Sequence, residues 1–201
     1  MKGKEEGDYQ LYNQMKKYMK EVDSKYVRPI VTRVYDTSWD MYDSHCYPGG
    51  SWRIHQLRKI LGEDCFWNSI TKYLNKFEKK IVETDDFRKV LEEESNLNLT
   101  KYFDEWFYSK GYPILKGDYS FKDNLLKIEF NQIQMDLKKG IGLFSFDLEV
   151  EFTFIEENES IKIQKEIFSF KDGKSKISKK IPTKIQPKMI RIDPDLKCLF
   201  N

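Results

Sequence analysis

The hydrophobic period of this chain changes near Pro113, and this change limits the folds open to it. Before Pro113, apolar residues recur every three or four positions, as they do on one face of a helix. After it they alternate with polar residues, most clearly over residues 144–154. Strict alternation indicates strands with one buried face. The sequence therefore predicts an α+β chain, with an all-α helical part at residues 1–112 and an antiparallel β-sandwich at residues 113–201.

Five helices are expected in the first part. They cover residues 8–22, residues 49–61, a third segment after Gly62, a segment that starts at an N-cap on Thr84, and residues 100–108. The third helix is expected to carry Phe66, Trp67, Ile70, Leu74 and Phe77 on one side. The second helix is expected to bury Ile54, Leu57 and Leu61, and to stop at Gly62.

In the second part, the sequence predicts several short strands, around residues 126–130, 144–154, 161–170 and 189–192. The apolar parity shifts inside residues 161–170, which favours a bulge there. Asp172-Gly173 is typical of a hairpin turn. Several antiparallel strands in so short a segment favour a sandwich.

Composition excludes some classes of function. The net charge is +2, and the lysines between Lys171 and Lys188 alternate with Ser, Ile and Pro as in a solvated hairpin, so nucleic acid is not an expected partner. No apolar run reaches the ~20 residues that span a bilayer, so no membrane is expected either. The three cysteines are far apart and odd in number, which favours reduced thiols and a cytoplasmic location.

Few residues in the sequence suggest a catalytic, metal-binding or ligand-binding role. The two histidines, His45 and His55, have no metal-binding spacing, and no metal ligand is predicted. Cys46 adjoins His45, but neighbouring side chains diverge, which argues against a nucleophile pair. Gly49-Gly50 at a helix start could bind an anion or allow tight packing. Tyr47 precedes this pair, where a phenol can project from a fixed backbone into a cleft.

The segment around Tyr47 resembles the membrane alanyl aminopeptidase family of zinc peptidases. The resemblance begins with Tyr47-Pro48-Gly49-Gly50-Ser51-Trp52 and the Leu-Gly-acidic ending of the helix that follows. Further similar segments are Arg28-Pro29-Ile30-Val31-Thr32, Thr84-Asp85-Asp86-Phe87, Leu99 with Phe103-Asp104-Glu105-Trp106, Gly111-Tyr112-Pro113, and the ending Pro187 to Pro194. The helical part then resembles the C-terminal part of a thermolysin-like catalytic domain, followed by the family's β domain.

The resemblance implies roles for two tyrosines. In the family, the tyrosine that matches Tyr47 donates a hydrogen bond to the oxyanion formed when a zinc-bound hydroxide attacks a peptide carbonyl. Tyr42 matches a tyrosine that lies near the substrate in some members. The family's H-E-x-x-H helix, its glutamate ligand and its Gly-x-Met-Glu-Asn strand have no match in residues 1–201. Zinc is therefore expected in the intact enzyme, and no cofactor is expected on this chain.

Two functions follow as hypotheses. The chain is either the C-terminal portion of a zinc aminopeptidase, inactive alone, or a non-catalytic protein-binding or assembly module on the same scaffold. The first predicts a peptide substrate in the intact enzyme, and an N-terminal catalytic portion or self-association as partner. It also predicts exposed apolar surface around Tyr47 and Trp52. A Tyr47 hydroxyl buried in a closed core would contradict it.

Overall fold

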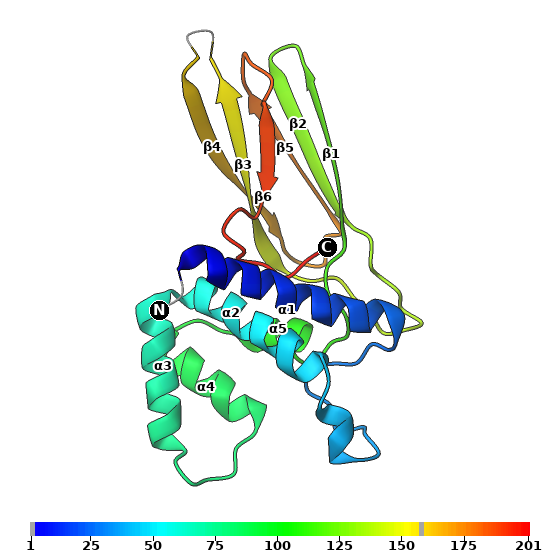
Figure 1. Cartoon of the computed structure of the whole chain (residues 1–201), viewed down its shortest axis with the longest axis vertical. Coiled ribbons are helices and arrows are strands. Elements are labelled where there is room, and N and C mark those ends of the chain that lie inside the picture. The colour runs from blue at the N-terminus through cyan, green and yellow to red at the C-terminus, as the bar shows by residue number, and fades with distance from the viewer. Residues whose placement is uncertain (1–2, 157–158) are drawn as a thin grey trace. The chain divides into compact units, whose positions relative to one another are not determined.

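A computed structural model describes residues 3–156 and 159–201 of the chain (Figure 1). It divides into two compact units, Met1–Gly111 and Tyr112–Asn201. The first unit is helical and the second consists of two small antiparallel sheets, so the predicted α+β class is confirmed. The division falls one residue before the predicted boundary. None of the described helices is both long and apolar enough to cross a bilayer.

The helical unit contains the five expected helices. They are α1 (Lys4–Ser24), α2 (Gly50–Leu61), α3 (Glu63–Lys76), α4 (Thr84–Ser95) and α5 (Thr100–Trp106), with a 3₁₀ turn at Ser38–Met41 and a π-helical turn at His45–Gly49. Gly62 has φ 81° and separates α2 from α3, as its sequence position predicts. Between α1 and the π-helical turn, the chain is mostly irregular.

The buried face of α2 differs from the predicted one. Only Leu57 of the three expected residues is fully buried, and the helix also buries Trp52, Arg53 and Gln56. Arg53 can be buried because its guanidinium finds hydrogen-bond acceptors on several neighbouring segments. A prediction that counts only apolar residues misses the buried Arg53 and Gln56, and it therefore assigns the wrong residues to the buried face of α2.

The cap of α4 lies one residue earlier than predicted. Glu83 occupies the N-cap, and its N–H donates to Asp86 Oδ2 at 2.9 Å in a capping box. The face predicted for α3 is only partly covered, because Phe66 is buried while Trp67 and Leu74 are exposed. Apolar side chains are common on the surfaces of folded proteins.

The second unit is a two-sheet sandwich. Its strands are β1 (Leu115–Lys122), β2 (Leu125–Gln132), β3 (Phe146–Ile155), β4 (Ile161–Phe170), β5 (Lys176–Pro182) and β6 (Met189–Ile192). One sheet has the order β1-β2-β5 and the other β4-β3-β6. The β1–β2 hairpin turns at Asp123-Asn124, both with positive φ. This turn is not among those predicted from the sequence.

Two predictions about β4 are wrong. It carries no bulge, since it pairs residue for residue with β3 from Phe146↔Phe170 to Ile155↔Ile161. The parity shift instead leaves Ile161 and Ile163 exposed, and turns polar residues inward, where Glu166 accepts a hydrogen bond from Lys179 at 2.6 Å. The Asp172-Gly173 turn exists, but it joins β4 to a strand of the other sheet and is no hairpin.

Candidate active-site turn around Tyr47

Tyr47 lies in the middle of the π-helical turn that leads into α2. Two backbone hydrogen bonds close this turn, from Gly49 N to Ser44 O at 2.8 Å and from Gly50 N to His45 O. Both glycine N–H groups are therefore already used, so the anion site considered from sequence is not available. π-helical turns are rare, and they often occur at functional sites.

Gly49 serves close packing. A Cβ atom at this position would lie 2.8 Å from Cδ2 of Tyr18 and 3.1 Å from Cδ1 of Ile30. The turn therefore rests directly on the Tyr18 ring, and only glycine allows this approach. Pro48 beside it is buried as well. The backbone that follows Tyr47 is thus fixed by packing.

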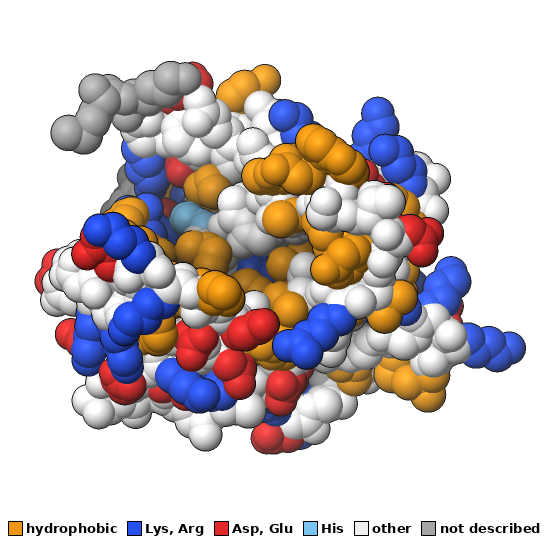
Figure 2. Space-filling view, turned by 90° about the horizontal axis from the view of Figure 1, so that it is seen from below, with side chains coloured by type: hydrophobic (Ala, Val, Ile, Leu, Met, Phe, Trp, Pro, Cys, Tyr) orange, Lys and Arg blue, Asp and Glu red, His pale blue; other side chains and the backbone are white. Residues whose placement is uncertain are grey.

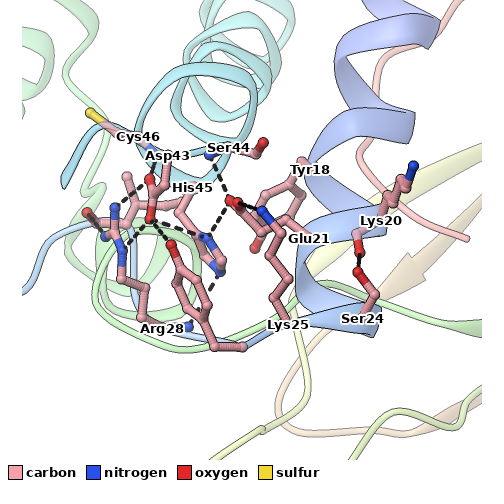
Figure 3. A network of polar contacts seen from close by, with 12 residues as sticks. Tyr18, Lys20, Glu21, Ser24, Lys25, Arg28, Asp43, Ser44, His45 and Cys46 are labelled. Atoms are coloured by element: carbon pink, nitrogen blue, oxygen red, sulfur yellow. Dashed lines mark hydrogen bonds and ion pairs between the residues drawn. The ribbon is translucent and has the colours of Figure 1, made fainter. Parts of the chain in front are cut away.

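The backbone that precedes Tyr47 is fixed by a polar network (Figure 3). Arg28 binds Asp43 through two hydrogen bonds, Nε to Oδ2 at 2.8 Å and Nη2 to Oδ1 at 2.7 Å. The Tyr26 hydroxyl and the Cys46 N–H donate to the same carboxylate at 2.9 and 2.8 Å. Partial burial would raise the pKa of Asp43, but these donors, Arg28 foremost, hold it below its usual value, so the carboxylate is ionised at neutral pH.

His45 joins this network to α1. Its Nδ1 lies 3.2 Å from Oε2 of Glu21, which also accepts the Ser44 N–H at 2.6 Å, and its Nε2 accepts the Arg28 N–H at 3.4 Å. The ring is fully buried and stacks on Tyr26 with centroids 5.1 Å apart. Burial lowers the pKa of His45 against the opposing effect of Asp43. A neutral ring that donates from Nδ1 and accepts at Nε2 satisfies both neighbours.

The Tyr47 side chain is 57% exposed, so its hydroxyl is not enclosed in a core. It lies beside Tyr42, with ring centroids 5.8 Å apart, and Tyr42 lies beside Trp39 at 5.2 Å. Partial removal of water, followed by the neighbouring Tyr42 hydroxyl, raises the pKa of Tyr47. The phenol therefore stays protonated at neutral pH and can donate a hydrogen bond.

The expected exposed surface is present only in part. Trp39, Tyr42 and Tyr47 are all exposed, and hydrophobic side chains gather around a hollow on the face shown in Figure 2. Trp52, however, is fully buried, and its indole N–H donates to Leu11 O at 2.7 Å. The prediction that Trp52 contributes to this surface is wrong, because the residue anchors α2 to α1.

Three residues of the network have the donor types of a metal site. One atom each from Glu21, Asp43 and His45 lies within 4.8 Å of the others, the single such group in the described part of the chain. These atoms do not fit zinc. The Arg28 guanidinium already neutralises Asp43 and would repel a cation, and both nitrogens of His45 have protein partners.

The comparisons with known proteins bear on this turn. The sequence pattern of the peptidase family M1 domain matches residues 2–106, which include the whole network. The chain belongs to peptidase family M1. Among M1-like relatives, glutamyl aminopeptidase of Sus scrofa is 35% identical over 75 residues, covering 37% of this chain and 8% of that protein. Aminopeptidase M1-A of Oryza sativa subsp. japonica is 28% identical over 103 residues, covering 51% of this chain and 12% of that protein.

A solved structure extends the likeness beyond the M1 match. The crystal structure of Legionella pneumophila aminopeptidase A in complex with aspartic acid superimposes with a TM-score of 0.64 at 11% identity, covering 92% of this chain and 21% of that chain. At this identity the likeness shows the fold alone. By these coverages, the chain spans only 8–21% of the length of the three proteins compared above.

Tyr47 is predicted from the sequence as a site residue and stays a prediction, whereas the residues that hold it in place were not predicted. The sequence suggests His45 only as a weak candidate for a metal ligand or nucleophile partner, and it suggests no site role for Glu21, Arg28 or Asp43. The alternation of Asp43, His45 and Tyr47 before a helix start was an available signal. No signal marks Glu21, which is one of many charged residues on α1.

Proposed function

We propose that this chain is the part of a zinc-dependent aminopeptidase that supplies Tyr47 for stabilisation of the transition state. The phenol donates a hydrogen bond to the oxyanion that forms when the peptide carbonyl at the substrate's N-terminal residue is attacked. One observation carries the proposal. Tyr47 is an exposed, protonated phenol on a backbone fixed from both sides, inside the segment that matches the M1 family.

The geometry suits a donor prepared in advance. An oxyanion donor is effective when it needs no reorganisation as charge develops, and removing one costs about 10²–10³ in kcat. The turn meets this requirement because its backbone is held by the Asp43 carboxylate on one side and by the Tyr18 ring on the other. The zinc and the attacking nucleophile are assigned to a part of the enzyme outside residues 1–201, since the described residues do not fit a zinc site.

Tyr42 is proposed as a substrate contact. It is 66% exposed, and its ring lies between those of Trp39 and Tyr47. An exposed ring beside the reacting carbonyl can pack against a substrate side chain. Tyr42→Ala is therefore expected to raise KM more than it lowers kcat. A reducing compartment such as the cytoplasm is the location proposed for the enzyme, on the basis of its three separated cysteines.

Two measurements test the proposal. The chain alone should bind no stoichiometric zinc and should not cleave aminoacyl-anilides, and turnover with bound zinc would refute the assignment. In enzyme reconstituted with an H-E-x-x-H region, Tyr47→Phe should lower kcat by about 10²–10³. Tyr9→Phe, at an exposed tyrosine on α1, is the matched control and should leave kcat unchanged. Equal activity of both variants would exclude Tyr47 as the donor.

A further inference from the structure

The turn that bears Tyr47 depends on a carboxylate from a distant helix. Glu21 lies in the last turns of α1, and it is buried although it is acidic. Its Oε2 accepts the Ser44 N–H at 2.6 Å and faces His45 Nδ1 at 3.2 Å, so one oxygen serves two residues just before Tyr47 (Figure 3). The other oxygen faces Lys25, whose ammonium is largely exposed, at 3.4 Å.

His45 transmits this contact to the turn. Its ring is held between Tyr26, stacked at 5.1 Å, and Tyr18, edge-on at 5.3 Å. Its own carbonyl accepts the Gly50 N–H that closes the π-helical turn. A ring packed on both sides cannot turn without moving the backbone that carries it, and Asp43 Oδ2 lies farther from Nδ1, at 3.5 Å, than Glu21 Oε2 does. The position of Glu21 therefore limits where the turn can lie.

We infer that Glu21 is a positioning residue, which acts through Ser44 and His45 to fix the orientation of the Tyr47 phenol. The inference rests on the proposed role of Tyr47. Without the carboxylate, the partly buried Ser44 N–H would lose its acceptor, and the buried His45 ring N–H would keep only the more distant Asp43 Oδ2, 3.5 Å from Nδ1. The backbone of the turn would then shift, and the Tyr47 phenol would change its orientation. The acceptor atom, rather than the charge, is what the two donors require.

Glutamine provides the matching rescue. The substitution Glu21→Gln would keep an acceptor oxygen where Oε2 lies and would lose only the contact to Lys25. Glu21→Ala removes the acceptor altogether. Glu5→Ala, at an exposed acidic residue in the first turn of the same helix, controls for the loss of a carboxylate from α1.

The test uses the 201-residue chain with tyrosines labelled at the ring carbon that bears the hydroxyl. The Tyr47 NMR signal is assigned as the one that disappears in Tyr47→Phe. Glu21→Ala should shift or broaden the Tyr47 signal, whereas Glu21→Gln and Glu5→Ala should leave it in place. Tyr119, in the second unit, should be unchanged in every variant. An unmoved Tyr47 signal in folded Glu21→Ala, or an equal shift in Glu21→Gln, overturns the inference.

If Glu21→Ala does not fold, Glu21→Asp decides the question. Aspartate keeps the charge but draws the carboxylate back by one methylene, so the Tyr47 signal should shift; an unchanged signal overturns the inference. In the reconstituted enzyme, Glu21→Ala should lower kcat about tenfold with KM unchanged, and Glu21→Gln should restore it. The NMR signal does not depend on turnover. A failure of Tyr47 as oxyanion donor is therefore distinguishable from a failure of Glu21 as its positioning residue.

Discussion

The interiors of the two units are built differently. The helical unit buries charged and titratable side chains that join segments far apart in sequence, such as Glu21, His45 and Arg53. The β unit is filled mainly by alternating apolar residues, and its buried charged residues bond close by. Asp193 accepts the N–H groups of Lys197 and Cys198, and Glu151 pairs with Arg191 on the neighbouring strand. Strands satisfy their backbones through ladders, whereas irregular segments need side chains to do so. The buried side chains of Glu21 and Arg53 accordingly bond to backbone groups outside their own helices, and the candidate site lies where the backbone is irregular.

The largest effect is expected from Arg53→Met in the helical unit. The Arg53 guanidinium donates to the carbonyl oxygens of Gly49, Trp106 and Gly111 and to the Tyr18 hydroxyl. Methionine would fill the space but could make none of these hydrogen bonds, so the unit should lose about 4 kcal/mol of stability. All four tryptophans lie before residue 112, so urea unfolding followed by tryptophan fluorescence measures this unit.

The control for that variant lies on the same helix. Arg58 is a more exposed arginine that binds Glu63 with Nη2 to Oε2 at 2.6 Å. Arg58→Met should cost less than about 1 kcal/mol, because exposed ion pairs add little. Equal losses for Arg53→Met and Arg58→Met would contradict the view that buried polar bonds hold the helical unit together.

The corresponding change in the β unit is Phe152→Ala. This side chain is fully buried on β3, and its truncation should cost about 3–4 kcal/mol through lost burial and the cavity left behind. Hydrogen exchange of the β3 and β4 amides measures the loss. Ile161→Ala, at a residue 69% exposed on β4, should cost less than about 1 kcal/mol. A large loss at Ile161 would show that the outer face of this sheet is covered.

Adjacent glycines offer a finer comparison within the helical unit. Gly49→Ala should destabilise the unit by about 2 kcal/mol, because the new methyl group would meet the Tyr18 ring at 2.8 Å. Gly50→Ala meets nothing closer than 3.9 Å and lies at the start of α2, so it should be neutral or stabilise by up to about 1 kcal/mol. Thermal unfolding of the two variants compares them directly, and equal melting temperatures would remove packing as the reason for Gly49.

The smallest effect is a dependence on pH at the edge of the network. Desolvation, followed by the hydrogen bond to Asp43, raises the pKa of Tyr26 from 10.0 to about 12. Tyrosine in the unfolded chain loses its proton first, so the stabilising contribution is complete below about pH 10 and is lost as the pH rises towards about 12. Tyr26→Phe should therefore flatten the fall in stability over this range. Parallel curves for the two proteins would show that Tyr26 does not couple to folding.

The two units also differ in how far their sequences predict them. The alternation of residues 146–154 predicts the inner face of β3, because a strand with one buried face needs an apolar residue at every second position. It fails for β4, where polar residues face inward to meet Lys179 of the other sheet. The role of Tyr47 is predicted from the family resemblance of the sequence around it, and it stays a prediction. Glu21 could not, because its burial depends on Ser44 and His45, which only the tertiary fold brings to it.

The strand order of the β unit has a consequence for dividing this chain. One sheet contains β1, β2 and β5, although β3 and β4 lie between β2 and β5 in the sequence. The other contains β3, β4 and β6, although β5 lies between β4 and β6 in the sequence. Neither sheet is therefore encoded by a continuous stretch of sequence. A break in the loop between β2 and β3 would leave the first fragment without its third strand, so complementation by two halves of the sandwich would require strand exchange between them.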